Sequence, residues 1–120
     1  MKTILFVEDE TTLQKSLSVA LKESYNVFSA LDGETGLTLA REQKPDLILL
    51  DLILPKRDGF SVLEELKKDD LTKNIPVIIL TNLENNLEIE KALNLGATTY
   101  LVKSQYSLGD IKNKVTKMLE

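Results

Sequence analysis

Three acidic residues stand where apolar segments of the sequence stop, and they are the first candidates for chemistry. Glu8 and Asp9 directly follow the apolar run from Lys2 to Val7. Asp51 lies inside the segment Leu47 to Leu54, where every other residue is apolar. A buried, unpaired carboxylate is strongly unfavourable, so Asp51 must be neutralised, hydrogen-bonded or bound to a metal.

Thr81 and Lys103 end or follow two further apolar segments. Taken singly, each candidate has a structural explanation: Asp51 can cap the following turn, Thr81 suits a strand, and Lys103 can be a surface lysine. Together they favour phosphoryl transfer to a carboxylate. Clustered acids attract a hard cation such as Mg²⁺, a carboxylate needs no base to act as a nucleophile at neutral pH, and an ammonium and a hydroxyl suit phosphate oxygens.

Hydrophobic periodicity predicts five strands that alternate with five helices. The expected strands are Lys2–Val7, Tyr25–Ala30, Leu47–Leu50, Val77–Thr81 and Thr99–Val102. The first helix is expected to be capped by Thr11 or Thr12, to end near Lys22, and to bury Leu13, Leu17, Ala20 and Leu21. The second helix is expected to bury Gly36, Leu37 and Ala40 and to end before Pro45, and the third to bury Val62, Leu63 and Leu66. The fourth is expected to bury Ile89, Ala92 and Leu93 and to end at Gly96. The fifth is expected to be capped by Ser107 with Asp110 and to bury Leu108, Ile111, Val115, Met118 and Leu119.

This alternation predicts an α/β fold, a flavodoxin-like doubly wound parallel sheet of five strands in the order 2-1-3-4-5 with five helices. Ligands of such sheets bind beyond the carboxyl ends of the strands, where the strand order reverses. The first and third strands are neighbours in this order. Glu8, Asp9 and Asp51 are therefore expected to meet.

The composition limits the chemistry further. At 120 residues, with 42% hydrophobic and 28% charged residues, the chain is expected to form one globular domain, 1–120, and to stop when its fifth helix is complete. It has no Cys and no His, so oxygen atoms must hold any metal. A net charge of -4 argues against direct contact with nucleic acid, and the absence of a long apolar run argues against a membrane segment or signal peptide. We therefore expect a cytoplasmic protein.

Four short motifs occur in order over essentially the whole chain: Val7-Glu8-Asp9-Glu10, Asp51-Leu52-Ile53-Leu54-Pro55 with Asp58-Gly59, Thr81, and Tyr100-Leu101-Val102-Lys103. Together they resemble the receiver domain of bacterial two-component response regulators. The resemblance implies that Asp51 is the phosphoacceptor, that Asp9 is a direct Mg²⁺ ligand, and that Glu8 binds the metal directly or through water. It also implies that the backbone carbonyl of Ile53 completes the ligand set, that Thr81 and Lys103 contact the phosphoryl group, and that Tyr100 is an aromatic switch.

The same resemblance implies how the chain would act. A sensor histidine kinase or phosphotransfer protein would supply the phosphoryl group from a phospho-His, and the fourth helix, fifth strand and fifth helix would present a changed surface to a downstream protein. The chain would not be an enzyme with a separate substrate, although it would assist its own phosphorylation and dephosphorylation. It would be a monomer or a phosphorylation-dependent dimer.

Three residues depart from the family pattern. Ser104 follows Lys103 where the family usually has a proline in a cis bond, Asn82 is larger than the usual residue after Thr81, and Glu8 replaces the commoner Asp. The first two keep open the alternative of a degenerate receiver that acts as a phosphorylation-independent interaction module.

Two enzymatic or cofactor-binding alternatives fit less well. A flavin-binding protein should offer backbone N–H groups and hydroxyls after its first strand, not the acids at Glu8 and Asp9. A phosphatase of the haloacid dehalogenase type needs a second Asp two residues after its nucleophile, and this chain has Ile53 there.

Overall fold

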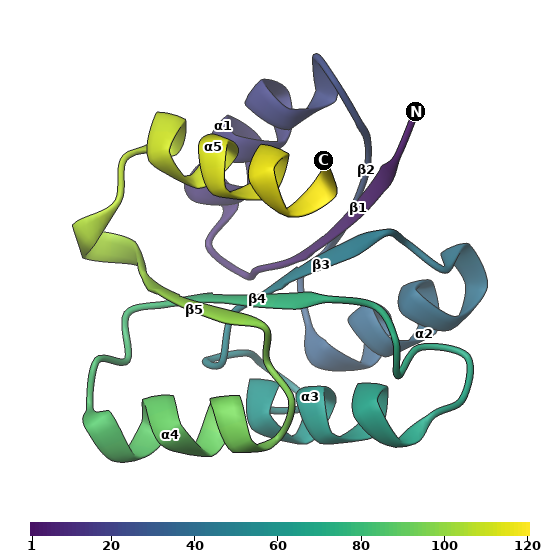
Figure 1. Cartoon of the computed structure of the whole chain (residues 1–120), viewed down its shortest axis with the longest axis vertical. Helices are drawn as coiled ribbons and strands as arrows, with labels where there is room; N and C mark the ends of the chain where they lie inside the picture. Colours follow the sequence, from purple (N-terminus) through teal and green to yellow (C-terminus); the bar gives the residue numbers. More distant parts are fainter.

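A computed structural model describes all residues from 1 to 120 and contains one five-stranded sheet flanked by helices (Figure 1). The strands are β1 (Thr3–Val7), β2 (Asn26–Ala30), β3 (Leu47–Leu50), β4 (Val77–Thr81) and β5 (Thr99–Val102). The helices are α1 (Thr11–Lys22), α2 (Gly33–Gln43), α3 (Gly59–Lys68), α4 (Asn86–Asn94), the short 3₁₀ helix η1 (Lys103–Gln105) and α5 (Leu108–Leu119). Every strand and helix expected from the sequence is present, although β1 and β2 each start one residue later than predicted.

The sheet has the order β2-β1-β3-β4-β5, with all neighbours parallel, so the predicted flavodoxin-like topology is confirmed. The register pairs Val7 of β1 with Leu50 of β3. It also pairs Thr81 of β4 with Val102 of β5. The residues that follow these positions therefore emerge at the same edge of the sheet.

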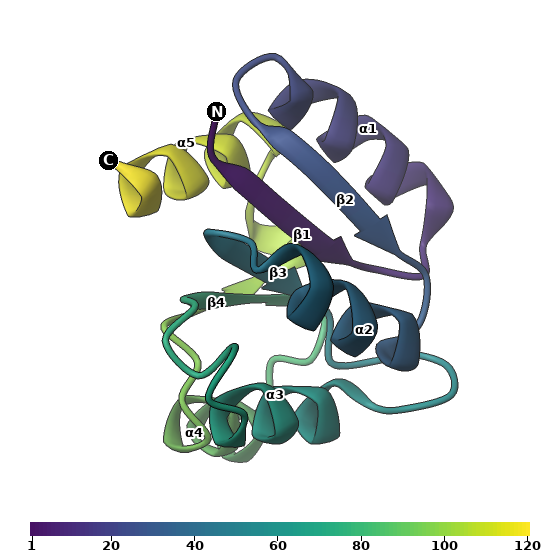
Figure 2. The ribbon, with the colours of Figure 1, turned by 90° about the vertical axis from the view of Figure 1, so that its right-hand side faces the viewer.

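Two hydrophobic clusters cover the two faces of the sheet, with α2, α3 and α4 on one face and α1 and α5 on the other (Figures 1 and 2). Strand β3 contributes to both, because side chains alternate between the faces. Ile48 and Leu50 lie in the first cluster, and Leu47 and Leu49 in the second. This explains why β3 is apolar at every position and why Asp51, the next residue, stands out.

The cap predicted for the last helix, from Ser107 and Asp110, is confirmed. Ser107 caps α5 by accepting a 3.1 Å hydrogen bond from the backbone N–H of Asp110, and the Asp110 carboxylate accepts one from the Ser107 N–H in return. At the start of α3, Asp58 accepts from the N–H of Ser61. These bonds satisfy amide groups that have no partner inside a helix.

The predicted cap of the first helix is wrong. Thr11 and Thr12 are the first two residues of α1, and Glu10 occupies the cap position without a side-chain cap bond. The chain turns earlier than expected because the backbone N–H of Glu10 donates to Oε2 of Glu8 at 3.0 Å.

Two residues expected in buried stripes are exposed. Leu93 of α4 retains 45% of its accessible surface and Leu108 of α5 retains 39%. Helix α4 covers the edge of the sheet with Ala92 as its only fully buried residue, and Leu108 opens α5 one turn before its first core residue, Ile111. None of the helices combines the length and the apolar character that a membrane crossing requires.

Candidate functional site

The carboxylates of Glu8, Asp9 and Asp51 converge at the edge where β1 and β3 end. One oxygen from each lies within 4.8 Å of the others. Glu8 is fully buried and Asp51 is 3% exposed, whereas Asp9 is open to solvent. The pairing of Val7 with Leu50 produces this meeting, because Glu8 and Asp51 are the next residues of their strands.

Lys103 reaches the same cluster from the end of β5. Its Nζ donates a hydrogen bond of 2.9 Å to Oδ2 of Asp51. The same nitrogen lies 2.6 Å from Oε1 of Glu8 and forms an ion pair with it. The chain contains no cis peptide bond, so Lys103 and Ser104 are joined in the trans form and continue into η1.

Burial and ion pairing have opposite effects on the pKa values of Glu8 and Lys103. Burial and, to a smaller extent, the nearby charge of Asp51 raise the pKa of Glu8, whereas Lys103 and the Glu10 N–H lower it, and the net result is a pKa of about 7. Burial also disfavours the charged form of Lys103. Its contacts with Glu8 and Asp51 outweigh that effect, so the pKa of Lys103 is raised above its ordinary value.

The backbone after β3 is closely packed around Asp51. Oδ1 of Asp51 accepts a hydrogen bond of 3.1 Å from the N–H of Ile53, which turns the chain back beside the carboxylate. The N–H of Gly59 donates to the carbonyl of Leu52 at 2.8 Å. A Cβ atom on Gly59 would lie 2.3 Å from the backbone oxygen of Asp51, so only glycine fits there.

Thr81 and Tyr100 share a partner in the loop between β4 and α4. Thr81 is fully buried, and its Oγ1 accepts a long hydrogen bond of 3.5 Å from the N–H of Leu83. The hydroxyl of Tyr100 donates to the carbonyl of Leu83 at 2.6 Å. Burial, with the charges of Glu88 and Asp51, raises the pKa of Tyr100 to about 12, so this hydroxyl keeps its proton.

Sequence reasoning did not single out Gln14. Its side-chain amide donates to the backbone carbonyls of Glu8 at 3.0 Å and Ala30 at 3.2 Å. It also missed Leu83, which takes part through its backbone. Neither residue type signals such a role, because any residue has a carbonyl and a helical Gln is usually solvated.

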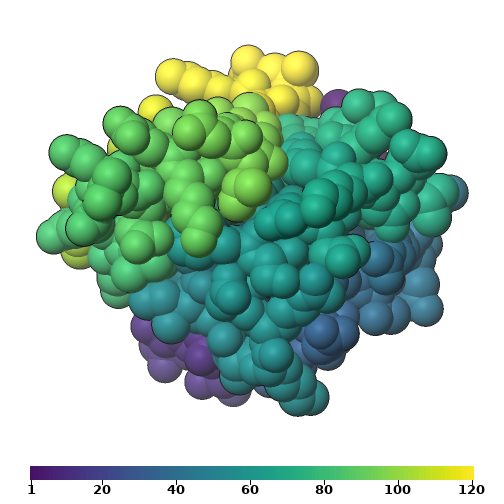
Figure 3. Space-filling model, turned by 90° about the horizontal axis from the view of Figure 1, so that it is seen from below, coloured from purple at the N-terminus to yellow at the C-terminus, as the bar shows by residue number.

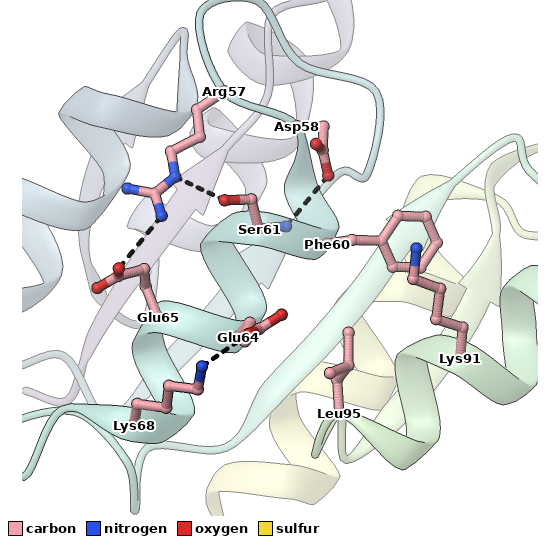
Figure 4. A pocket seen from close by; sticks show the side chains of 9 residues that line it. All are labelled: Arg57, Asp58, Phe60, Ser61, Glu64, Glu65, Lys68, Lys91 and Leu95. Atoms are coloured by element: carbon pink, nitrogen blue, oxygen red, sulfur yellow. Dashed lines mark hydrogen bonds and ion pairs between the residues drawn. The ribbon is translucent and has the colours of Figure 1, made fainter.

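A groove of about 320 Å³ lies between α3 and α4, which belong to the teal and green parts of the surface in Figure 3, and its lining residues, drawn in Figure 4, do not include Glu8, Asp9 or Asp51. Its charged groups already have partners. Lys68 contacts Glu64 at 2.7 Å, Arg57 contacts Glu65 at 3.3 Å, and the ammonium of Lys91 lies 4.3 Å from the ring centre of Phe60. The groove therefore offers no convergent set of free groups comparable with that around Asp51.

The acidic cluster fits a hard divalent cation. Its side-chain donors are all carboxylate oxygens, which Mg²⁺ prefers over nitrogen or sulfur ligands. The exposed Asp9 leaves the cluster open to solvent on one side, as a metal that keeps several water ligands requires.

Comparison with known proteins agrees with this geometry. The family model of the response regulator receiver domain matches residues 4–116. The transcriptional regulatory protein AfsQ1 of Streptomyces coelicolor is 38% identical over 86% of this chain and 45% of its own length. The phosphorylated cyanobacterial phytochrome response regulator RcpA is 34% identical, with a TM-score of 0.84 over 98% of this chain and 90% of that one.

A third relative holds a metal. The receiver domain of the sensor histidine kinase PA1611 from Pseudomonas aeruginosa, with a magnesium ion coordinated in its active-site cleft, is 28% identical and has a TM-score of 0.87 over 98% of this chain and 97% of that one. The chain spans about half the length of the curated relatives it matches, or less. The family match covers nearly the whole chain, and on this ground the chain belongs to the response regulator receiver domain family, the phosphoacceptor domains of two-component signalling.

Proposed function

We propose that Asp51 accepts a phosphoryl group from the phospho-His of a sensor histidine kinase or phosphotransfer protein. The observation that carries this proposal is the buried Asp51 carboxylate beside Glu8 and Asp9, with an ammonium 2.9 Å from its Oδ2. Residues 1–120 form the receiver domain in this proposal. The cytoplasmic location stays a prediction.

A Mg²⁺ ion would be held by the carboxylates of Glu8, Asp9 and Asp51 and by the backbone carbonyl of Ile53. When bound, the ion offsets negative charge on the acids and on the phosphoryl oxygens. The presence of magnesium in the related PA1611 receiver domain supports this assignment.

The reaction forms one bond and breaks another. A carboxylate oxygen of Asp51 attacks phosphorus, the bond from phosphorus to the histidine nitrogen breaks, and that nitrogen keeps the electron pair. Lys103 already stands beside Oδ2 of Asp51, where its ammonium can contact a phosphoryl oxygen. Thr81 offers a hydroxyl from the neighbouring strand end. Water would later hydrolyse the acyl phosphate. The same groups of the chain would surround the phosphorus in both reactions, so the chain would assist its own phosphorylation and its own dephosphorylation.

We expect phosphorylation to change the surface formed by α4, β5 and α5. Phosphorylation would replace the single charge of the Asp51 carboxylate with an acyl phosphate that carries roughly one and a half to two negative charges, and its phosphoryl oxygens could accept a hydrogen bond from Thr81. Movement of Thr81 toward them would disturb its contact with Leu83, which also holds the Tyr100 hydroxyl. The reoriented Tyr100 would change the surface that a downstream protein meets, or the surface of a phosphorylation-dependent dimer.

We propose that the chain itself contacts proteins and not nucleic acid. Its net charge is -4, and the acids lie at the proposed site. AfsQ1 and several other relatives are named as transcriptional regulators, and this chain covers about half of each or less.

The test is phosphorylation by a small donor. Acetyl phosphate with Mg²⁺ should add one phosphate to the intact mass of the wild-type chain and none to Asp51→Asn. Asp70→Asn is a matched control, because Asp70 has an exposed side chain that pairs only with Lys73. No adduct on the wild-type chain, under quenching fast enough to trap short-lived species, would favour a phosphorylation-independent interaction module instead.

A further inference from the structure

The side chain of Gln14 joins the ends of two strands beside the acidic cluster. Gln14 lies in the first turn of α1 and is partly buried. Its Nε2 donates to the carbonyl of Glu8, just past β1, and to the carbonyl of Ala30, the last residue of β2. The Ala30 carbonyl also accepts the N–H of Glu8 at 2.9 Å.

These bonds enclose the backbone of Glu8 from both sides. Its N–H is held by Ala30 and its carbonyl by Gln14. A primary amide has two N–H hydrogens, so one Gln14 nitrogen can serve both carbonyls. The opposite orientation would aim the amide oxygen at two carbonyl oxygens, which fixes the orientation with the nitrogen inward.

The side chains of Glu8 and Asp9 differ in how they are held: the Glu8 carboxylate contacts Lys103 and the Glu10 N–H, whereas the Asp9 carboxylate has no such partner. The cap residue of α1, Glu10, makes no side-chain cap bond, and its N–H is bound to the Glu8 carboxylate itself. The Asp9 side chain is exposed and forms no ion pair or side-chain hydrogen bond. The place of the Asp9 carboxylate relative to Asp51 therefore depends on the backbone of the turn, and the same backbone sets the direction from which Glu8 reaches Lys103.

We infer that Gln14 is a positioning residue for the cation site, which it serves by fixing the backbone at Glu8 so that the carboxylates of Glu8 and Asp9 face Asp51. This inference rests on the metal site of the proposed function. Partners that orient metal ligands typically change metal affinity by ten- to a hundredfold when they are lost. Gln14 acts through the backbone and not on a ligand atom, so we expect the lower end, about tenfold.

The test compares Gln14→Met with Gln43→Met. Methionine keeps the length of the side chain and removes the donors, and Gln43 is an exposed residue at the end of α2. Mg²⁺ alone is titrated into each protein, and the amide NMR signals of Asp9 and Asp51 report binding. Gln14→Met should weaken Mg²⁺ binding about tenfold, while Gln43→Met should leave it unchanged.

A second variant, Gln14→Asn, distinguishes the loss of the two hydrogen bonds from the loss of a polar side chain. It also provides a test if Gln14→Met does not fold. Gln14→Asn keeps the amide but is too short to reach both carbonyls, so it should also weaken Mg²⁺ binding. Urea unfolding of the same proteins shows whether affinity falls in a folded chain. Wild-type Mg²⁺ affinity in folded Gln14→Met or Gln14→Asn would overturn the inference. No Mg²⁺ binding by the wild-type chain would overturn the proposed metal site itself, and this inference with it.

Discussion

Lys103 donates a 2.9 Å hydrogen bond to Asp51, the carboxylate that we propose as the phosphoacceptor. The same ammonium lies 2.6 Å from Glu8, so one cation compensates two buried acids. Its raised pKa keeps it charged at neutral pH.

Lys103→Met should destabilise the metal-free protein at pH 8 by about 2 kcal/mol, because it leaves two carboxylates without their cation. The expected loss is below the usual range for a broken buried pair, since Glu8 can take up a proton. Urea unfolding in EDTA measures it. Lys112→Met removes a lysine whose partner, Glu23, is on the surface, and it should change stability by less than about 0.5 kcal/mol. Equal losses in the two variants would contradict the pairing.

Glu8 should make the stability of the metal-free protein fall as pH rises from about 4.5 to 7. Its pKa is about 7 in the folded chain against an ordinary 4.5, so between these values the folded state holds a proton that the unfolded state has lost. Above pH 7 Glu8 is charged in both states, and the loss in the free energy of unfolding is complete. At about 1.4 kcal/mol per pH unit between the two pKa values, this loss is at most about 3 kcal/mol.

Glu8→Gln isolates this effect from other titrating groups. Hydrogen bonds and ion pairs lower the pKa of Asp32, Asp69 and Asp110, and these acids lose their stabilising effect as pH falls. Urea unfolding in EDTA should show the advantage of Glu8→Gln over the wild-type chain growing from pH 5 to pH 8. If the free energies of unfolding of the two proteins differed by the same amount at every pH, Glu8 would titrate in the folded chain like an ordinary carboxyl group.

Gly59→Ala should destabilise the protein by about 2 kcal/mol, because the new methyl group would lie 2.3 Å from the backbone oxygen of Asp51 and 2.4 Å from Cα of Leu52. Gly109→Ala is the matched control. A Cβ there meets only the Ser107 Oγ at 3.8 Å, and alanine in a helix should stabilise the chain by about 0.5 kcal/mol. Thermal unfolding of both variants measures the contrast, and a stable Gly59→Ala would refute the close packing around Asp51.

Tyr100→Phe should loosen the loop between β4 and α4 at a cost of about 1 kcal/mol, because it removes the 2.6 Å hydrogen bond to the Leu83 carbonyl. Hydrogen exchange should accelerate in this loop and not in β1 or β3. Tyr25→Phe removes a hydroxyl with only a 3.4 Å contact to Thr116 and should leave the loop unchanged. Unaltered exchange in Tyr100→Phe would show that the hydroxyl does not hold the loop.

Local patterns predicted the fold and much of the site because they reflect local physics. The uniformly apolar β3 indicated a strand covered on both faces, and strand order then brought Glu8 and Asp9 to Asp51. The Ser107–Asp110 cap could be predicted because the side chains of these two residue types form the capping hydrogen bonds themselves. Roles in metal binding, phosphoryl contact and switching stay predictions.

Other features depend on tertiary geometry that residue types do not encode. The cap prediction for α1 was wrong because the Glu8 carboxylate binds the Glu10 N–H, and the helix then begins directly after Glu10. Leu83 takes part through its backbone, and Gln14 through two carbonyls that meet only in the folded sheet. Leu93 follows helical spacing, yet α4 buries too narrow a stripe to include it.

The most direct test of the central claim locates the phosphate without a mutation. The wild-type chain is phosphorylated with acetyl phosphate and Mg²⁺, the acyl phosphate is reduced with borohydride, and tandem mass spectrometry of the peptides identifies the reduced carboxyl group. We expect reduction at Asp51 alone, and only when both acetyl phosphate and Mg²⁺ are present. Reduction at Glu8 or Asp9, or at several surface acids without preference, would contradict the assignment of Asp51 as the phosphoacceptor.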